Sequence, residues 1–474
     1  MPPPSPTPIR VAIVGGGIAG LSAAVRLGEL SPASEVTVFE AQPQPGGVLR
    51  TLRDNGWLIE QSADNFLTKL PYATQLCETL GVADQLLETD PARRRALVVN
   101  LGRVTPTPEG FLLMSARTIV PILRTPLLSW RGRLRLLCEP FVPRKRDDSD
   151  ESVASFARRR VGEEAFQRLV QPLLAGIYTA DPEKLSMQAT MPQFVEQERE
   201  HGSLFLAARR QENRVRGESG ARYSQFVAPR EGMQSIVDAA VRRLPAGAVR
   251  VAAEVRAIQK TARGWRVEAP DADPHEFDGV IVATPSYAAA ALLTGVDPDL
   301  SSLLDQIPYA GSSIVCLGVR EDQLPSLPTG FGFVVPAAEG RRIIAASFSS
   351  LKFPDRTPSG RLLIRVFVGG ALQPELAELP DADLERLALE ELRELCGLTG
   401  EPERVVIARW PRRMPQYHLG HNALVDEIFA LADRHPGLGL AGAAYRGVGV
   451  PQCVHSGQQA ADRVHARLTG EAGT

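Results

Sequence analysis

The sequence predicts a multidomain α/β protein with a Rossmann-like unit, a domain built on a mixed sheet, and a helical region. Three observations predict this class. The chain has 474 residues, more than one hydrophobic core usually holds. Its first forty residues alternate strand, helix and strand, and residues 313–370 contain several short strands. A composition of 44% hydrophobic and 23% charged residues is typical of a globular protein.

The Rossmann-like unit opens the chain. Residues 10–14 form a short β-branched run bounded by glycines, the pattern of a buried parallel strand. Residues 18–29 carry apolar side chains at helical spacing, and residues 35–40 (EVTVFE) form a second strand. Strand, helix and strand within about thirty residues indicate a βαβ unit with a right-handed crossover.

The loop after the first strand carries three glycines at the G-x-G-x-x-G spacing, followed by the first helical residues: Gly15, Gly17 and Gly20, with Ile18 and Ala19. The first glycine makes the tight turn, the second admits a pyrophosphate, and the third lets helix and strand pack closely. The pyrophosphate is expected against the free amides of the helix N-terminus. Glu40 ends the second strand, where it can accept hydrogen bonds from a ribose. The pattern predicts a dinucleotide site.

Two further glycine segments favour FAD over a nicotinamide cofactor. Gly46 and Gly47 let the chain run close along an extended cofactor, and Arg50 can reach its phosphates. Near the C-terminus a glycine-rich stretch leads into a helix over residues 451–467, whose N-terminus can stabilise negative charge on a reduced flavin. The predicted cofactor contacts here are Gly442, Val448, Gly449 and Val450, and we add Val255 in the middle of the chain.

The remaining segments supply other elements. A helix is expected between residues 68 and 80, charged helices over 151–213, and a helix over 380–396. Strands of an antiparallel sheet are expected at residues 313–320, 331–336, 343–349 and 361–370. Residues 111–146 hold eight basic side chains against one acid, Glu139, interleaved with leucines and Trp130. This basic segment is either a solvated helical face or a contact with anionic lipid.

Composition excludes several classes of protein. A net charge of −2 gives no reason to expect nucleic acid as a partner. The five cysteines are scattered, which fits reduced thiols in the cytoplasm better than disulfides or a zinc site. His418 and His421 lack a third ligand nearby, so no metal is predicted. No run reaches the ~18 apolar residues that a membrane-spanning helix needs.

Beyond the cofactor motifs, several segments resemble the protoporphyrinogen and coproporphyrinogen III oxidases of the flavin amine oxidase superfamily. They are residues 175–181 (AGIYTAD) with 185–187, 330–336 (GFGFVVP), 348–356, 367–370 (FVGG) and 415–421 (PQYHLGH). The resemblance covers nearly the whole chain, in order. It implies six-electron oxidation of protoporphyrinogen IX or coproporphyrinogen III in haem biosynthesis, with O2 as acceptor and H2O2 as product. The flavin performs the redox step, so no catalytic side chain is assigned.

The resemblance also implies three discontinuous parts. The FAD-binding domain is expected at 8–93, 226–290 and 432–474, the substrate-binding domain at 94–110, 206–225 and 291–431, and a helical, membrane-docking domain at 111–205. It further implies that the protein, expected in the cytoplasm, can sit peripherally on the membrane face. The oligomeric state, a homodimer included, stays open.

Substrate residues are carried over by position. Arg95, with Arg94 as the adjacent alternative, lies where the family places a cation for a substrate carboxylate; a solvated basic cluster is the competing interpretation. Phe367 and Val334 match positions that sandwich the macrocycle, although core packing alone would also explain them. Ser347 stands where leucine is common, and Gly176 matches a glycine whose carbonyl faces the ring.

Three positions depart from the family pattern. Asp64 replaces an asparagine, Ala443 replaces another, and residues 231–234 keep one glycine of a pair. Two alternatives stay open. One is another enzyme of the superfamily, such as an amine oxidase or carotenoid desaturase, and residues 175–181 and 367–370 argue against it. The other is a non-catalytic FAD-binding protein of the haem pathway, which the departures at Asp64 and Ala443 keep open.

Overall fold

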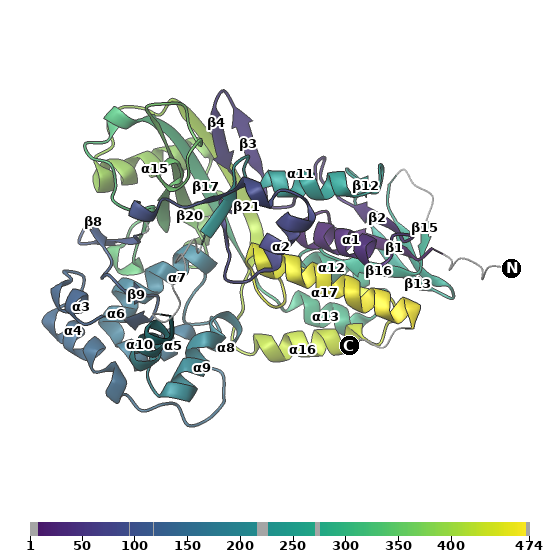
Figure 1. Cartoon of the computed structure of the whole chain (residues 1–474), viewed down its shortest axis with the longest axis horizontal. Helices are drawn as coiled ribbons and strands as arrows, with labels where there is room; N and C mark the ends of the chain where they lie inside the picture. Colours follow the sequence, from purple (N-terminus) through teal and green to yellow (C-terminus); the bar gives the residue numbers. More distant parts are fainter. Residues whose placement is uncertain (1–7, 94, 117, 216–225, 271–274, 471–474) are drawn as a thin grey trace.

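The computed structural model describes residues 8–93, 95–116, 118–215, 226–270 and 275–470. They form three regions: a parallel sheet flanked by helices, a seven-stranded sheet, and a group of short helices (Figure 1). Each region has its own hydrophobic cluster.

The parallel sheet has the strand order β12-β2-β1-β16-β22. Its strands are β1 (Arg10–Val14), β2 (Glu35–Phe39), β12 (Val249–Arg250), β16 (Gly279–Val282) and β22 (Leu438–Leu440). Alternate residues of β1 face opposite clusters, because Val11 and Ile13 pack on one side and Ala12 and Val14 on the other. The βαβ prediction for residues 10–40 is confirmed.

Helices cover both faces of the parallel sheet. On one face lie α1 (Ile18–Leu30), α2 (Tyr72–Thr79), α11 (Gln234–Arg243) and α17 (Val450–Thr469). On the other lie α12 (Ser286–Leu293), α13 (Pro298–Asp305) and α16 (His421–Ala432). The two ends of the chain meet where α1 lies beside α17 (Figure 1). Helix α2 is shorter than the segment 68–80 expected for it, because Pro71 precedes its first residue.

The seven-stranded sheet has the order β21-β17-β20-β19-β18-β7-β8. Its strands are β7 (Leu97–Asn100), β8 (Arg103–Pro106), β17 (Tyr309–Arg320), β18 (Gly332–Val334), β19 (Ala345–Phe348), β20 (Arg361–Gly369) and β21 (Arg404–Pro415). The predicted antiparallel strands pair as expected, and the parallel pairing of β18 with β7 makes the sheet mixed. Helix α15 (Asp381–Cys396) covers one face. Against the other face packs the hairpin of β3 (Thr51–Asp54) and β4 (Trp57–Glu60).

The helical region packs around its own cluster, which also takes in Val98 and Tyr417. Its α-helices are α3 (Val120–Arg124), α4 (Trp130–Leu137), α5 (Val153–Val161), α6 (Glu163–Ala165), α7 (Gln171–Tyr178), α8 (Met187–Thr190), α9 (Pro192–His201) and α10 (Leu204–Val215). A π-helical turn, η4 (Phe166–Val170), joins α6 to α7. The fully buried Arg160 pairs with Glu139 and Glu198 and ties these helices together.

Smaller elements complete the fold. The remaining strands are β5 (Phe66–Leu67), β6 (Leu86–Glu88), β9 (Phe111–Leu112), β10 (Ser115–Ala116), β11 (Phe226–Pro229), β13 (Ala257–Thr261), β14 (Gly264–Glu268) and β15 (His275–Phe277), and the one remaining α-helix is α14 (Ser349–Lys352). Short 3-10 turns are η1 (Ala83–Gln85), η2 (Pro91–Arg93), η3 (Glu139–Phe141), η5 (Glu321–Gln323), η6 (Ala337–Glu339) and η7 (Pro374–Glu378). Within the described ranges, no helix is long and apolar enough to cross a membrane.

Candidate functional site

The glycine loop after β1 has the geometry that a bound pyrophosphate needs. Gly15 adopts φ +109°, which favours glycine, and a Cβ on Gly20 would lie 2.0 Å from the Gly15 carbonyl oxygen. A Cβ on Gly17 would meet nothing within 4 Å. Gly17 is also the N-cap of α1 and offers no side-chain cap, so the first amides of α1 face open space.

Glu40 lies against this loop. Its carboxylate accepts hydrogen bonds from the backbone amides of Gly16 and Gln42, each at 2.8 Å. Each carboxylate oxygen therefore keeps a lone pair for a further donor. The side chain is thus fixed at the end of β2, next to the N-terminus of α1.

The second glycine pair runs beside the first loop. Gly46 and Gly47 have φ of +117° and +60°, and Gly46 forms a parallel bridge with Gly17. Arg50 follows, with its guanidinium 5.7 Å from the Trp410 ring and with a buried Nε that has no hydrogen-bond partner. A buried donor without a partner is costly, which fits a site for a phosphate or another acceptor.

The C-terminal segment closes the same site. Gly442 has φ +125° and open space where a Cβ would stand, and Gly449 caps α17 without a side-chain hydrogen bond. Val448 packs against the helical cluster, while Val450 is buried with α1. Ala443 accepts a hydrogen bond from the Tyr417 hydroxyl through its carbonyl oxygen, which an asparagine could do equally well. Two uncapped helix ends, the open glycines and the orphaned Arg50 donor together fit a dinucleotide.

Val255 lies in a loop beyond β12. It is buried in the cluster that covers the α12 side of the parallel sheet. Packing alone accounts for its position.

The predicted substrate residues gather on one face of the seven-stranded sheet. Register pairs Val334 with Ala345, and Ala345 with Phe367, so these side chains share a face, and Ser347 follows two residues further along β19. All three predicted residues on this face are half-buried. Gly176 of α7 stands opposite, where a Cβ would come within 3.2 Å of Val334 Cγ1. The structure therefore brings Gly176, Val334, Ser347 and Phe367 together.

The predicted carboxylate anchor lies at the edge of this face. Arg95 is exposed and precedes β7, and Arg94 lies outside the described residues. Arg93 is already engaged, because it donates to the Pro328 carbonyl oxygen and pairs with Asp90.

A buried group of charges adjoins the same face. Asp64 pairs with Lys352 at 3.1 Å and with Arg365 at 3.2 Å. These cations hold the pKa of Asp64 below its usual value although burial acts to raise it. The carboxylate that departs from the family pattern is thus neutralised inside the protein.

Sequence reasoning missed both Lys352 and Arg365. Arg365 is two residues before Phe367 on β20, so strand alternation alone puts it on the same face. Lys352 ends α14 inside the segment 348–356 that carries the family resemblance. Neither position shows from the sequence that Asp64 lies within reach.

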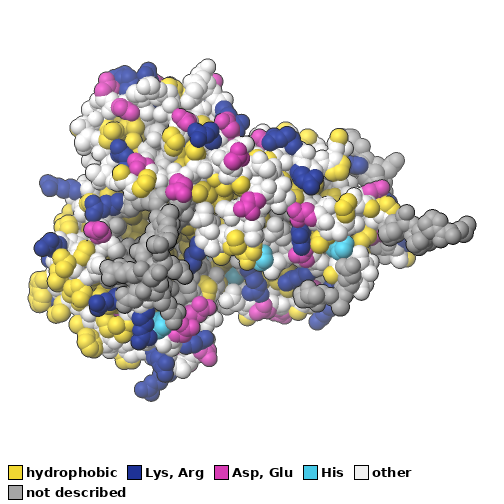
Figure 2. All heavy atoms as spheres, in the orientation of Figure 1, with side chains coloured by type: hydrophobic (Ala, Val, Ile, Leu, Met, Phe, Trp, Pro, Cys, Tyr) yellow, Lys and Arg dark blue, Asp and Glu magenta, His cyan; other side chains and the backbone are white. Residues whose placement is uncertain are grey.

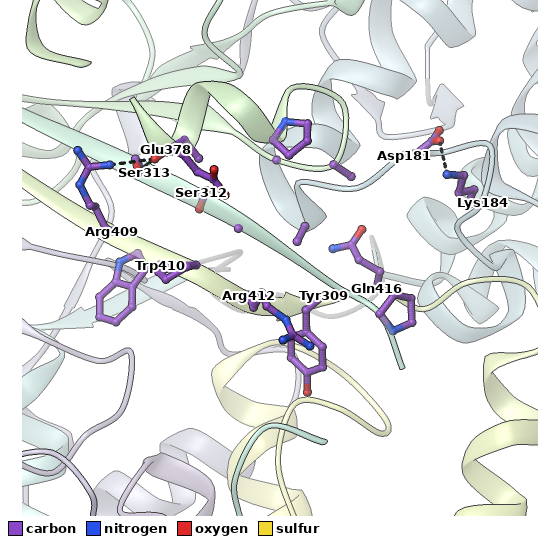
Figure 3. A pocket seen from close by; sticks show the side chains of 18 of the residues that line it. Asp181, Lys184, Tyr309, Ser312, Ser313, Glu378, Arg409, Trp410, Arg412 and Gln416 are labelled. Carbon is purple, nitrogen blue, oxygen red and sulfur yellow. Dashed lines mark hydrogen bonds and ion pairs between the residues drawn. The ribbon is translucent and has the colours of Figure 1, made fainter. Parts of the chain in front are cut away.

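A cavity of about 430 Å³ opens at one end of β17 and β21, and Trp410, whose ring lies beside Arg50, is part of its lining (Figure 3). Tyr309, Arg412 and Gln416 line it on one side, and Asp181 and Lys184 form an ion pair on the other. None of the predicted substrate residues lines this cavity.

His421 has structural partners. His421 stacks on Tyr417 and hydrogen-bonds through Nε2 to the Tyr445 carbonyl oxygen, and burial lowers its pKa to about 4. Within the described part of the chain no group of His, Cys, Asp and Glu could hold a metal ion.

Comparison with known proteins identifies the class. The sequence profile of the family described as flavin containing amine oxidoreductase matches residues 18–465. The chain belongs to this family, whose cofactor here is FAD. A cyclohexylamine oxidase from Brevibacterium oxydans IH-35A has the same fold, with a TM-score of 0.71 at 16% identity over 98% of this chain and all of its own.

The more similar relatives place the chain among the porphyrinogen oxidases of that family. It is 33% identical to a coproporphyrinogen III oxidase of Bacillus subtilis, over 95% of this chain and 97% of that protein. It is 31% identical to the coproporphyrinogen III oxidase of Staphylococcus aureus, covering 97% and 99%. A crystal structure from Exiguobacterium sp. 255-15, assigned as a protoporphyrinogen oxidase, superposes with a TM-score of 0.84 at 28% identity over 96% and 98% of the two chains.

Proposed function

We propose that this chain oxidises coproporphyrinogen III to coproporphyrin III in haem biosynthesis, with O2 as the electron acceptor. The observation that carries the proposal is full-length similarity above 30% to bacterial coproporphyrinogen III oxidases. Protoporphyrinogen IX is the second candidate substrate, because plant protoporphyrinogen oxidases match at 27% identity over 97% of the chain.

The residues of the glycine loops are proposed to hold FAD. The α1 amides after Gly17 would bind the pyrophosphate, Glu40 a ribose, and Arg50 a phosphate. The N-terminus of α17 after Gly449 would favour negative charge on the ring. Bound FAD supplies the two-electron oxidation by accepting a hydride from a substrate carbon.

The side chains of this protein are proposed to position the substrate and exclude water. Phe367, Val334 and Gly176 offer apolar surface against the porphyrinogen ring, and Arg95 offers a cation for a carboxylate at its edge. Three rounds remove six electrons and six protons from the porphyrinogen and convert three O2 to three H2O2. Protons leave to water or through tautomerisation of the substrate, so no general base is required.

The test is aerobic turnover of the FAD-loaded protein with coproporphyrinogen III and protoporphyrinogen IX side by side, followed by porphyrin fluorescence and H2O2 release. We expect faster oxidation of coproporphyrinogen III and one H2O2 for each electron pair. Failure to oxidise either compound with FAD still bound would refute the proposal.

The outer face of α3, α4 and η3 is proposed to dock on an anionic lipid surface. Several large apolar side chains are exposed there: Leu123, Trp130, Leu134 and Phe141, the last at 86%. Arg124 and Arg131 are exposed among them, whereas Glu139 is buried against Arg160. Figure 2 shows apolar and basic side chains gathered over this part of the surface, at the left. Such a mixture suits an interfacial contact.

Sedimentation with vesicles tests this docking surface. Wild type is expected to bind vesicles containing phosphatidylglycerol and to bind phosphatidylcholine alone more weakly. Trp130→Ser with Phe141→Ser should abolish binding, whereas Leu372→Ser, an exposed leucine on the seven-stranded domain, should not. Equal binding by all three proteins would contradict the proposal.

A further inference from the structure

Five ionisable side chains form a buried charge cluster between the end of β4 and the substrate face of the seven-stranded sheet. They are Glu60, Asp64, Lys352, Arg356 and Arg365. Three are cations and two are carboxylates, so the cluster has an excess of positive charge among the described residues. A buried cation without a matching anion is costly, which makes such a site receptive to an anionic group.

Asp64 stands at the centre of the cluster. The Lys352 ammonium donates to both of its carboxylate oxygens, each at 3.1 Å. Arg365 approaches Oδ2 at 3.2 Å and also donates to the Ser62 carbonyl oxygen. Arg356 is turned away, since it donates to the carbonyl oxygens of Pro229 and Arg230.

Lys352 and Arg365, the two cations that pair with Asp64, differ in solvent exposure. The Arg365 side chain is 1% exposed, whereas 14% of Lys352 and 11% of Asp64 remain accessible. An ammonium has three donors, and Asp64 occupies at most two of them. Lys352 therefore keeps a donor that an entering group can reach, whereas the unpartnered Nε of Arg365 is buried.

The cluster adjoins the predicted substrate face. Arg365 is the register partner of Ser347, and its guanidinium lies 5.2 Å from the Phe367 ring. Lys352 follows Ser347 by five residues, and its carbonyl oxygen accepts a hydrogen bond from Asp90, just before the arginine segment 93–95. The ammonium is thus linked, through Asp64 and Arg365, to the face on which the porphyrinogen is proposed to lie.

We infer that Lys352 binds a carboxylate of the porphyrinogen and that Asp64 is a positioning residue, which holds the ammonium while Arg365 fixes Asp64 from behind. This inference rests on the proposed function. It gives the departure at Asp64 a role: an asparagine would offer the ammonium one neutral acceptor, whereas the carboxylate offers two charged ones.

The test compares Lys352→Met and Lys352→Arg with wild type. For coproporphyrinogen III, Lys352→Met is expected to raise KM about tenfold with kcat within about twofold, because one charge-assisted contact is lost in ground and transition states alike. Lys352→Arg should recover most of the loss. Lys184→Met is the matched control, because Lys184 is 66% exposed, pairs with Asp181 and lies outside the buried charge cluster, and it should leave KM unchanged.

A binding measurement separates charge from packing. The affinity for coproporphyrin III, measured by quenching of its fluorescence, should fall about tenfold in Lys352→Met. The tetramethyl ester, measured in detergent, should bind both proteins with equal affinity. Flavin absorbance and the thermal midpoint check that each variant is folded and loaded. An unchanged KM, or equal losses for acid and ester, would overturn the inference.

A double-mutant cycle tests the role of Asp64. If Asp64 acts through Lys352, Asp64→Asn changes KM in the wild-type background and has no further effect in Lys352→Met. Additive effects would contradict the positioning role. If wild type oxidises no porphyrinogen at all, the proposed function fails first, so the two failures are distinguishable.

Discussion

The glycine loops and the buried charge cluster are stabilised in different ways. The loop at residues 15–20 depends on missing side chains: a Cβ on Gly20 would stand 2.0 Å from a carbonyl oxygen. The cluster depends on side chains that must all be present, because Asp64 is held by residues almost 300 positions later in the chain.

This difference determines what a substitution in each region is expected to change. A glycine loop presents backbone amides whose positions follow from the local chain, so it binds the constant part of a cofactor. A cluster of opposed charges is sensitive to the loss of any member, since each removal leaves a buried partner unpaired. Variation in substrate is therefore expected to appear in the cluster, and cofactor loss in the loops.

The largest effect on stability is expected from Arg365→Met. It removes the fully buried partner of Asp64 and the donor to Ser62, which should lower the free energy of unfolding by about 3–5 kcal/mol. Urea denaturation of the FAD-loaded protein measures it. Arg365→Met combined with Asp64→Leu should recover part of the loss; a double variant less stable than the single one would show that the pair is not the cause.

Glu60 gives the cluster a pH dependence. Burial raises the pKa of Glu60 to about 7 from 4.5, although Met233, Thr51 and Arg365 oppose the shift. The folded state therefore keeps the proton that the unfolded state releases, so stability is highest below about pH 4.5 and falls as pH rises towards 7. The rise in the pKa of Glu60 from 4.5 to about 7 corresponds to a loss of roughly 3 kcal/mol in the free energy of unfolding between low and neutral pH.

Glu60→Gln should remove that dependence. The amide oxygen of the new side chain can still accept from the Met233 amide, and its NH2 group can donate to the Thr51 hydroxyl oxygen in place of the second carboxylate oxygen, but the amide cannot ionise. In wild type the urea midpoint should be lower at pH 7.5 than at pH 5. In Glu60→Gln the change in midpoint between the two pH values should be much smaller. The same pH slope in both proteins would refute the assignment to Glu60.

The same contrast explains what the sequence could predict. The glycine loop, β2 and Glu40 are local, so spacing within forty residues was enough to place them. Phe367, Val334 and Ser347 were assigned by resemblance, and strand register explains why they share a face. The pairing of Asp64 with Lys352 was not predictable, because it depends on how α14 sits against the end of β4, and no short-range pattern encodes that contact.

The smallest effects on stability are expected from substitutions at two glycines of α1, and their comparison is the sharpest test of the loop. Gly20→Ala should destabilise the protein by about 1–3 kcal/mol and release FAD, because the new Cβ would collide with the Gly15 carbonyl oxygen. Gly28→Ala meets nothing within 4 Å and should stabilise α1 by about 0.5–1 kcal/mol, with FAD retained. Thermal midpoints and the flavin absorbance of the purified variants report both quantities. Opposite signs at positions eight residues apart would show that the loop needs glycine for contact with backbone rather than for flexibility. A neutral Gly20→Ala that keeps FAD would mean that the loop can shift and does not depend on a missing side chain at residue 20.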